Sequence, residues 1–326
     1  MKVNATTFNP GDSISFRNGD EWAGSVVLDE SGTAESAIRL NSYGSGTLPT
    51  VTSGEAGICF RLNGSYLEVD GLHAAGCGYA GFNVYGDHVA VTNSEASDNA
   101  AGIKVGTGSD FSIYSNNVLK NNNVMNVNTP GSRCGTAKAA DCTDDSGAFG
   151  VLINGNDNEF FGNTVTGSTA ASFDYGMDGG AFEIYNGSRN NIHHNHAIDN
   201  NVFSEVGRSD GVADGNVFRY NLVRSSCGAD CAEAVGLIIR GPDSQYGPTN
   251  STTFEFNTVW LNGRNSRGLV CHASCPSTTV IRDNILVAVR DALWLDGSGW
   301  VEQHNVVNGP SNVPLDSTST TVPQGS

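Results

Sequence analysis

The sequence predicts an all-β chain wound as a parallel β-helix, and three observations carry that prediction. Short apolar segments recur along the chain, an asparagine follows many of them at a fixed distance, and Gly/Asn-rich turns separate them. The shortest repeats are 21 or 22 residues long, which suits a coil of three short strands joined by such turns. Leucine-rich repeats have a similar period but need a Leu-x-x-Leu-x-Leu pattern, which this sequence lacks.

The recurring template reads apolar-x-x-Asn-x-apolar. It is found as Ile113-Asn116-Val118, Phe160-Asn163-Val165, Ile192-Asn195-Ala197, Phe218-Asn221-Val223, Phe254-Asn257-Val259 and Ile281-Asn284-Leu286. Incomplete copies are Val69-Leu72-Ala74, Val91-Ser94-Ala96 and a final one with Asn305 and Val307. Because a buried amide needs hydrogen-bond partners, we expect the asparagines to stack as an inward ladder along the coil axis.

The template also divides the chain into segments of one structural domain, because a solenoid buries one continuous core. Residues 1–55 lack the asparagine and are expected to form the first coils and a cap over the open N-terminal end. Residues 56–308 would form the β-helix. Residues 309–326 are rich in Ser, Thr and Pro and are expected to be a tail or linker. No apolar run follows Met1, so we expect that a signal peptide was removed.

Charge and hydropathy narrow the classes of partner. The net charge is −17 and only 16% of the 326 residues are charged. Phosphate binding requires clusters of Lys and Arg, so we expect neither nucleic acid nor an anionic membrane surface as a partner. No apolar run approaches the length of a transmembrane helix. An anionic or neutral glycan stays possible, and we expect the protein to act as a monomer.

Eight cysteines fall into four pairs that are close in the sequence: Cys59/Cys77, Cys134/Cys142, Cys227/Cys231 and Cys271/Cys275. We expect local disulfides, which indicate an oxidising, extracellular setting and therefore secretion. The alternative is zinc, since two pairs have Cys-x3-Cys spacing. No nearby His or Cys set completes four ligands, so disulfides are favoured.

With this repeat, roughly residues 55–310 resemble the right-handed parallel β-helix superfamily that contains pectate lyases, alginate and chondroitin lyases and polygalacturonases. The resemblance implies a right-handed parallel β-helix and activity on carbohydrate. The sequence lacks the paired aspartates and Gly-His-Gly of polygalacturonases, and the Asp-Pro-His-Asp of mannuronan epimerases. The superfamily hosts several chemistries, so the resemblance leaves the reaction open.

The strand before each asparagine turn can be aligned coil by coil, with apolar residues such as Phe182 and Ile184 directed inward. The first outward position then reads Asn83, Lys104, Leu152, Glu183, Glu205, Ile238, Val270 and Trp294. Two residues later the row reads Tyr85, Gly106, Asn154, Tyr185, Gly207, Arg240, His272 and Asp296. Glu183 and Glu205 are 22 residues apart, one coil, and would therefore lie side by side.

Two neighbouring carboxylates on an outward face point to function, because like charges placed opposite one another cost stability. One of the two should have a raised pKa unless a cation neutralises it. Insertions at 121–147, 167–180 and 207–216 could wall a cleft around them. The predicted catalytic residues are Glu183, Glu205, Asp178 and Arg240. The predicted substrate contacts are Lys104, Asn154, Tyr185, His272 and Trp294.

Three functions fit this pattern. A glycoside hydrolase would use Glu183 and Glu205 as paired carboxylates on a polysaccharide or oligosaccharide, and would require no cofactor. A polysaccharide lyase would hold Ca²⁺ with the same carboxylates, and Arg240 or Lys104 would abstract a proton, as the resemblance to pectate-lyase-like enzymes implies. A non-catalytic glycan-binding β-helix is the third. A further calcium loop is conceivable at Asp141, Asp144 and Asp145, with a solvated loop as its alternative.

Overall fold

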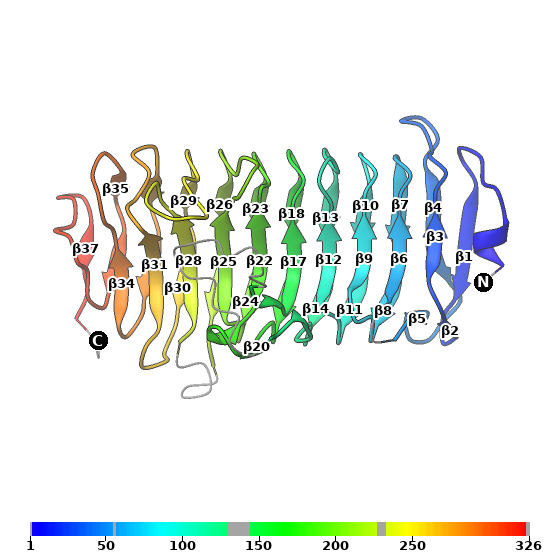
Figure 1. Cartoon of the computed structure of the whole chain (residues 1–326), viewed down its shortest axis with the longest axis horizontal. Helices are drawn as coiled ribbons and strands as arrows, with labels where there is room; N and C mark the ends of the chain where they lie inside the picture. Colours follow the sequence, from blue (N-terminus) through cyan, green and yellow to red (C-terminus); the bar gives the residue numbers. More distant parts are fainter. Residues whose placement is uncertain (1, 55–56, 130–143, 227–232, 324–326) are drawn as a thin grey trace.

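The computed structural model describes residues 2–54, 57–129, 144–226 and 233–323. In these residues the regular structure is β, apart from the short 3-10 helix η1 (Val3–Ala5). No helix of the described residues is long and apolar enough to cross a membrane. The strands wind into coils stacked along one axis, with the two termini at opposite ends of the stack (Figure 1).

The coils of the described chain build three long sheets, here named A, B and C, in which neighbouring strands are parallel. Sheet A contains β1 (Ser13–Arg17), β4 (Ile38–Tyr43), β7 (Leu67–Asp70), β10 (Ala90–Thr92), β13 (Ile113–Ser115), β18 (Glu159–Phe161), β23 (Asn191–His193), β26 (Val217–Arg219), β29 (Thr253–Glu255), β32 (Val280–Arg282) and β35 (Val301–Gln303). Sheet B contains β2 (Glu21–Ala23), β5 (Thr50–Thr52), β8 (His73–Ala75), β11 (Glu95–Ser97), β14 (Val118–Lys120), β19 (Thr164–Thr166), β24 (His196–Ile198), β27 (Leu222–Arg224), β30 (Thr258–Trp260), β33 (Ile285–Val287), β36 (Val306–Asn308) and β37 (Thr320–Thr321).

Sheet C carries the predicted outward row and is the sheet in front in Figure 1. It contains β3 (Val26–Leu28), β6 (Ile58–Leu62), β9 (Ala80–Val84), β12 (Ala101–Val105), β17 (Phe149–Ile153), β22 (Gly180–Tyr185), β25 (Val202–Gly207), β28 (Val235–Arg240), β31 (Arg267–His272) and β34 (Asp291–Trp294). The chain passes from A to B to C in each coil, so the molecule is the right-handed parallel β-helix that the sequence predicts.

The apolar template positions fill the interior. Phe160, Phe218 and Phe254 are fully buried, and rings of neighbouring coils pack against each other along the axis. Phe160 lies 6.1 Å from Phe182, and Phe182 lies 5.8 Å from Phe203, both edge to face. Aromatic pairs in this geometry add stability beyond their buried area. The two strands that carry Glu183 and Glu205 are therefore anchored from beneath by packed rings.

The asparagine ladder is confirmed. Asn195 Oδ1 accepts hydrogen bonds from the backbone N–H and the side-chain amide of Asn163, at 3.0 and 2.9 Å. The amide of Asn195 donates in turn to Asn221 Oδ1 at 3.1 Å and to the Phe160 carbonyl at 2.9 Å. The ladder runs through Asn117, Asn163, Asn195, Asn221, Asn257, Asn284 and Asn305.

One ladder position was predicted wrongly. The sequence favours Ile113-Asn116-Val118, whereas the buried frame is Tyr114-Asn117-Leu119, one residue later. Both frames satisfy the apolar-x-x-Asn-x-apolar template, and the larger apolar ring decides between them. Tyr114 is fully buried, and its ring stacks on that of Phe160 with a centroid distance of 4.8 Å. Asn116 instead occupies the turn position just before the ladder asparagine, with a positive φ of 55°.

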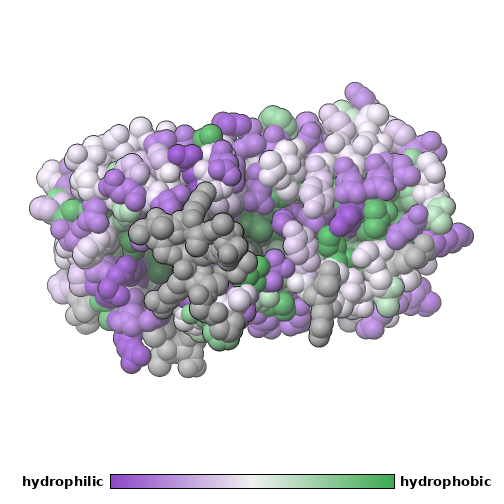
Figure 2. Space-filling view, in the orientation of Figure 1, coloured by the Kyte–Doolittle hydropathy of each residue, from purple (hydrophilic) through white to green (hydrophobic). Residues whose placement is uncertain are grey.

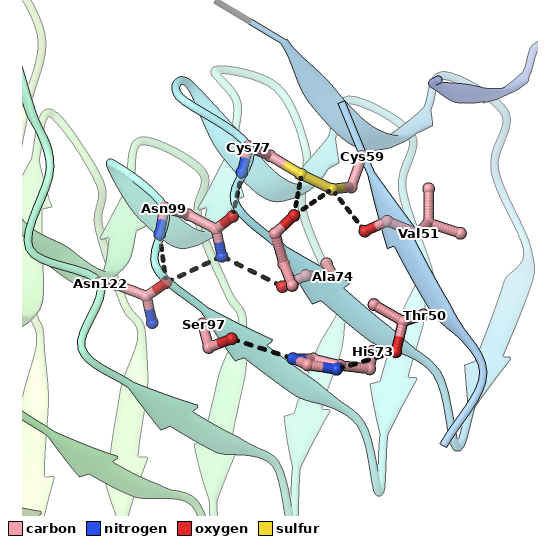
Figure 3. The surroundings of a disulfide bond; sticks show 10 residues. Thr50, Val51, Cys59, His73, Ala74, Cys77, Ser97, Asn99 and Asn122 are labelled. Atoms are coloured by element: carbon pink, nitrogen blue, oxygen red, sulfur yellow. Dashed lines mark hydrogen bonds between the residues drawn. A yellow bond between two sulfur atoms is a disulfide. The ribbon is translucent and has the colours of Figure 1, made fainter. Parts of the chain in front are cut away.

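Further turns carry ladders that the template does not reveal. Asn158, Asn190 and Asn216 are bonded in series at a second turn. At a third turn, Asn99 donates to Asn122 Oδ1 at 2.9 Å and accepts from the Cys77 backbone at 2.8 Å (Figure 3). The sequence evidence for these two ladders is the asparagines in the Gly/Asn-rich turns, but their spacing from the strands is less regular.

Two of the four predicted cysteine pairs lie in the described residues, and both are disulfides. Cys59 is joined to Cys77, where it links the first coils (Figure 3). Cys271 is joined to Cys275, directly beside His272 at the end of β31. The predicted pairs Cys134/Cys142 and Cys227/Cys231 lie outside the described residues.

The ends of the β-helix are covered by short segments. Val3 and Phe8 pack against the core at the N-terminal end, in the region where a cap was expected. In the C-terminal segment, β37 pairs with β36, and Val313 and Leu315 pack against the core.

Candidate functional site

Strand pairing in sheet C produces the outward row that the sequence predicts. Lys104 lies opposite Leu152, and Leu152 lies opposite Glu183. Glu183 lies directly opposite Glu205, which in turn lies opposite Ile238. Neighbouring strands are about 4.8 Å apart, so the two glutamates occupy the same position on consecutive coils.

A cleft of about 580 Å³ lies over this row. It brings together seven of the predicted residues: Glu183, Glu205, Asp178, Arg240, Lys104, Asn154 and Tyr185. The surface view shows the same face, hollowed near its middle (Figure 2). Two predicted substrate contacts, His272 and Trp294, are not among the residues that line this cleft.

Glu183 and Glu205 have different surroundings. The Nε of Arg240 donates to Glu205 Oε1 at 2.6 Å, and this ion pair is mostly shielded from water, with side-chain exposures of 18% and 21%. Burial raises the pKa of Glu183 well above its ordinary value, and the charges of Glu205 and Asp178 raise it further. Arg240 opposes this rise only in part. Glu183 thus holds its proton to higher pH than an ordinary glutamate, beside a glutamate that is paired with Arg240.

Asp178 is a second carboxyl with a raised pKa. It ends the hairpin strand β21 (Gly176–Asp178), which leads directly into β22. Burial raises the pKa of Asp178 to about 7, although a hydrogen bond from the Gly179 backbone at 2.7 Å works against the shift. The charge of Glu205 raises this pKa further. Asp178 therefore titrates in the physiological range beside the glutamate pair.

Arg240 organises the far side of the pair. Burial would lower its pKa, but the Glu205 carboxylate outweighs burial and raises the pKa above its ordinary value. Its Nη1 lies 3.0 Å from His272 Nδ1. Burial and the Arg240 charge lower the pKa of His272, so this imidazole is neutral near pH 7 and accepts from Arg240. His272 thus acts on the cleft through Arg240.

Two residues that were predicted to contact substrate, Lys104 and Trp294, are hydrogen-bonded to nearby side chains. Lys104 donates to the hydroxyl of Tyr79 and lies over its ring, at the end of the cleft nearer the N-terminus. Trp294 lies beyond Ile238 and Val270 in the outward row, and its indole N–H donates to Asp296 at 3.1 Å. Trp294 is therefore separated from the glutamate pair by two intervening strands.

Among the cleft residues that were not predicted as part of it are Asp144, Tyr175 and Tyr246. Asp144 accepts hydrogen bonds from both tyrosine hydroxyls, from Tyr246 at 2.5 Å. Tyr175 lies between β20 (Ala170–Ser172) and β21, inside the predicted insertion 167–180. Tyr246 lies in the turn-rich segment that follows Arg240. Tyr175 lies in a predicted insertion and Tyr246 does not, and only the fold shows that the two hydroxyls meet.

Asp145 holds Asp144 in place. Asp145 Oδ1 accepts from the Thr129 backbone at 2.9 Å, and Oδ2 accepts from Ser172 Oγ at 2.8 Å and the Asp174 backbone at 2.9 Å. Asp145 therefore connects the hairpin β15 (Met125–Val127)–β16 (Ser146–Gly147) to the hairpin β20–β21. Its oxygens accept from protein donors and it is buried, unlike the solvated loop that was expected as the alternative to a calcium loop. Asp141 lies outside the described residues.

The glutamate pair is a poor site for Ca²⁺. Within the described residues, no group of three or more His, Cys, Asp or Glu side chains is arranged to hold a metal ion. Glu205 is already committed to Arg240, which leaves too few free carboxylate oxygens for the six to eight oxygen ligands that Ca²⁺ prefers. The described residues therefore do not fit a calcium ion.

Comparison with known proteins supports the fold. No protein-family model matches the sequence, and no curated protein matches it. Among solved structures, the alginate lyase from Paenibacillus sp. str. FPU-7 is similar, with a TM-score of 0.66, 17% identity and coverage of 93% of this chain and 94% of that one. The GH136 lacto-N-biosidase from Eubacterium ramulus has a TM-score of 0.61 at 13% identity, over 99% of this chain and 62% of that one.

Pectate lyase Pel9A is similar over 96% of this chain and 70% of that one, with a TM-score of 0.56 and 13% identity. These likenesses extend over nearly the whole chain, but they include a hydrolase and lyases at low identity. They bear on architecture, since one fold can host several reactions. The chain has the right-handed parallel β-helix fold that these structures share.

Proposed function

We propose that the protein is a glycoside hydrolase in which Glu183 is the general acid and Glu205 is the carboxylate that attacks the sugar. The observation that carries the proposal is the contrast between two directly opposed carboxyl groups. Glu183 has a raised pKa, whereas Glu205 is paired with Arg240 at 2.6 Å. Environments that separate the protonation states of two neighbouring carboxyls identify an acid and a base or nucleophile.

The strand spacing of about 4.8 Å favours the short carboxyl separation of retaining enzymes, about 5–5.5 Å. In the first step, Glu183 donates its proton to the glycosidic oxygen while a Glu205 oxygen bonds to the anomeric carbon. The C–O bond to the leaving sugar breaks, and that sugar departs as an alcohol. In the second step, the Glu183 carboxylate takes a proton from water, and the water oxygen displaces Glu205. Each displacement inverts the anomeric carbon, so the net result is retention of configuration.

Charge in the cleft favours a neutral glycan. Carboxylates from several coils line it, including Asp144, Asp178 and Glu205. Among the described residues of its walls, the cations Lys104 and Arg240 are bonded to Tyr79 and Glu205. A uronate polymer would bring a carboxylate of its own to every sugar, and like charges repel at this range. Tyr185 offers a ring against which the apolar face of a sugar can pack.

Secretion belongs to the same proposal. The Cys59–Cys77 and Cys271–Cys275 disulfides suit an oxidising compartment, where polymeric glycans are degraded outside the cell.

A polysaccharide lyase is the second candidate, and the likeness to the alginate lyase over nearly the full length of both chains favours it. Its chemistry would need a base for the proton next to the uronate carboxyl. Arg240 is poorly suited to that role, because its ion pair with Glu205 raises its pKa and keeps it protonated. Lys104 could serve instead. A non-catalytic glycan-binding protein would show neither reaction.

A screen of neutral and uronate polysaccharides tests the proposal, read for new reducing ends and for ultraviolet absorbance of unsaturated products. The proposal predicts reducing ends from a neutral glycan, no absorbance, and activity that persists with a calcium chelator present. Absorbing products from a uronate polymer would establish the lyase instead. Binding of a glycan without any cleavage would establish the non-catalytic alternative.

A further inference from the structure

The cleft is crossed by a hydrogen-bonded bridge made from three separate insertions. Asp144 comes from the segment before β16, Tyr175 from the hairpin β20–β21, and Tyr246 from the loop after β28. Both tyrosine hydroxyls donate to the Asp144 carboxylate. We call these three residues the Asp144 bridge. Hydrogen bonds to a charged group are stronger than neutral ones, so the bridge is a firm contact.

The bridge joins the two ends of the central strands on their outward side. Tyr175 comes from the hairpin that enters β22 at its amino end. The Tyr246 ring lies 6.3 Å from that of Tyr185, at the carboxyl end of β22, and Arg240 lies over it at 5.8 Å. A six-residue strand spans about 16 Å, and Glu183 lies within that span. The bridge therefore runs along the strand direction, across the axis of the β-helix.

The protonation states support the bridge. Burial raises the pKa of Tyr175 and of Tyr246, and the Asp144 carboxylate raises each further through its hydrogen bond and charge. Both hydroxyls thus keep the proton that they donate. Asp145 fixes the neighbouring backbone through Thr129, Ser172 and Asp174, so the carboxylate of Asp144 is held from its own side too.

A crossing of this kind decides how a polymer can enter. A long glycan that lay along the β-helix axis would pass the row Lys104, Glu183, Glu205 from coil to coil, and the Asp144 bridge lies across that path. The volume of about 580 Å³ lies in the range of pockets for small ligands. Access is left to the end of a chain.

We infer that the Asp144 bridge restricts this site to chain ends, so that the protein releases mono- or disaccharide units from the terminus of a glycan rather than cutting it internally. This inference rests on the proposed hydrolase and adds its mode of action. Asp144, Tyr175 and Tyr246 are positioning residues that set specificity, and Glu183 and Glu205 carry out the cleavage.

The test compares two readouts on one neutral polysaccharide that the parent protein cleaves: the number of new reducing ends and the loss of viscosity. Cleavage from chain ends produces reducing ends and short products while viscosity changes little. Early loss of viscosity with a ladder of intermediate lengths would overturn the inference and leave the hydrolase intact. Failure to cleave any glycan, or cleavage that Glu183→Gln does not affect, overturns both.

Variants of the bridge separate its role from simple folding. Tyr246→Phe and the double variant Tyr175→Phe/Tyr246→Phe keep the rings and remove the hydroxyls that hold Asp144. Loss of one hydrogen bond to a carboxylate should increase viscosity loss per reducing end about tenfold. The matched control is Tyr220→Phe, an exposed ring beside β26 and outside the cleft, which should leave this ratio unchanged. An unchanged ratio in the double variant would show that the bridge does not set the mode of cleavage.

Discussion

Glu183 and Glu205 lie directly opposite one another on β22 and β25, and only Glu205 is ion-paired with Arg240. Two carboxylates that repel one another would ordinarily be relieved by solvent. Here burial works against solvation, so the pKa of Glu183 is raised, while Glu205 is paired with Arg240. An arrangement that costs stability and persists on a concave face is typical of an active site.

The ion pair gives the first prediction. Arg240→Met should leave the Glu205 carboxylate shielded and unpaired, at a cost of about 3 kcal/mol in the free energy of unfolding. The matched control is Arg39→Met, whose pair with Glu68 is about half exposed and should cost at most about 1 kcal/mol. Urea unfolding monitored by circular dichroism measures both. Equal costs for the two variants would mean that the Glu205–Arg240 pair is solvated.

The pH dependence of activity gives the second. Glu183 must be protonated to act as the acid, so kcat/KM should fall as pH rises through its raised pKa. The charge of Asp178 contributes to the raised pKa of Glu183. Asp178→Asn should therefore move the fall of kcat/KM at alkaline pH to lower pH. Asp157→Asn, at a surface pair with Arg189, serves as control and should not move it. A limb that stays in place in Asp178→Asn would contradict the coupling of the two carboxyls.

Asp178 should also make stability depend on pH. Its pKa is about 7 in the folded protein against an ordinary value of 3.8, so the folded state holds the proton more tightly than the unfolded state. Its contribution is complete below about pH 4 and is lost as pH rises to about 7. Asp178→Asn should remove this part of the slope, so that Tm declines less between pH 4 and 7 than in the parent protein. An identical slope in both proteins would show that Asp178 titrates normally.

Repetition explains how much of this could be predicted from sequence. The period of about 22 residues fixes which residues lie on neighbouring coils, and so placed Lys104, Glu183, Glu205 and Arg240 on one face. Where two frames satisfied the template, the pattern failed: Asn116 was chosen, and burial of the Tyr114 ring selects Asn117.

The insertions carry no period, and contacts between them were therefore outside what the pattern could reach. Asp144 accepts hydrogen bonds from Tyr175 and Tyr246, which lie 31 and 102 residues away in the sequence. His272 and Trp294 were placed on the correct face, since alternation gives direction. Alternation does not give the extent of a cleft, and both fall outside it.

The ladder gives the fourth prediction. Asn195 is buried and bonds to Asn163, Asn221 and the Phe160 carbonyl. Asn195→Ala should leave these partners unsatisfied and lower the free energy of unfolding by about 1–3 kcal/mol. Asn191→Ala, on the outward side of the same coil, is the control, with an expected change within about 0.5 kcal/mol. Similar losses in the two variants would argue against a special role for the ladder.

The central claim is that Glu183 donates the proton and Glu205 attacks the sugar, and one kinetic comparison tests it. Glu183→Gln, Glu205→Gln and the surface control Glu68→Gln are assayed on a glycan and on the matching aryl glycoside, whose leaving group needs little protonation. The account predicts that Glu183→Gln loses about 10²–10⁴-fold of kcat on the glycan and far less on the aryl glycoside. Glu205→Gln should lose activity on both, and Glu68→Gln on neither. Full activity of Glu183→Gln on the glycan would contradict the account.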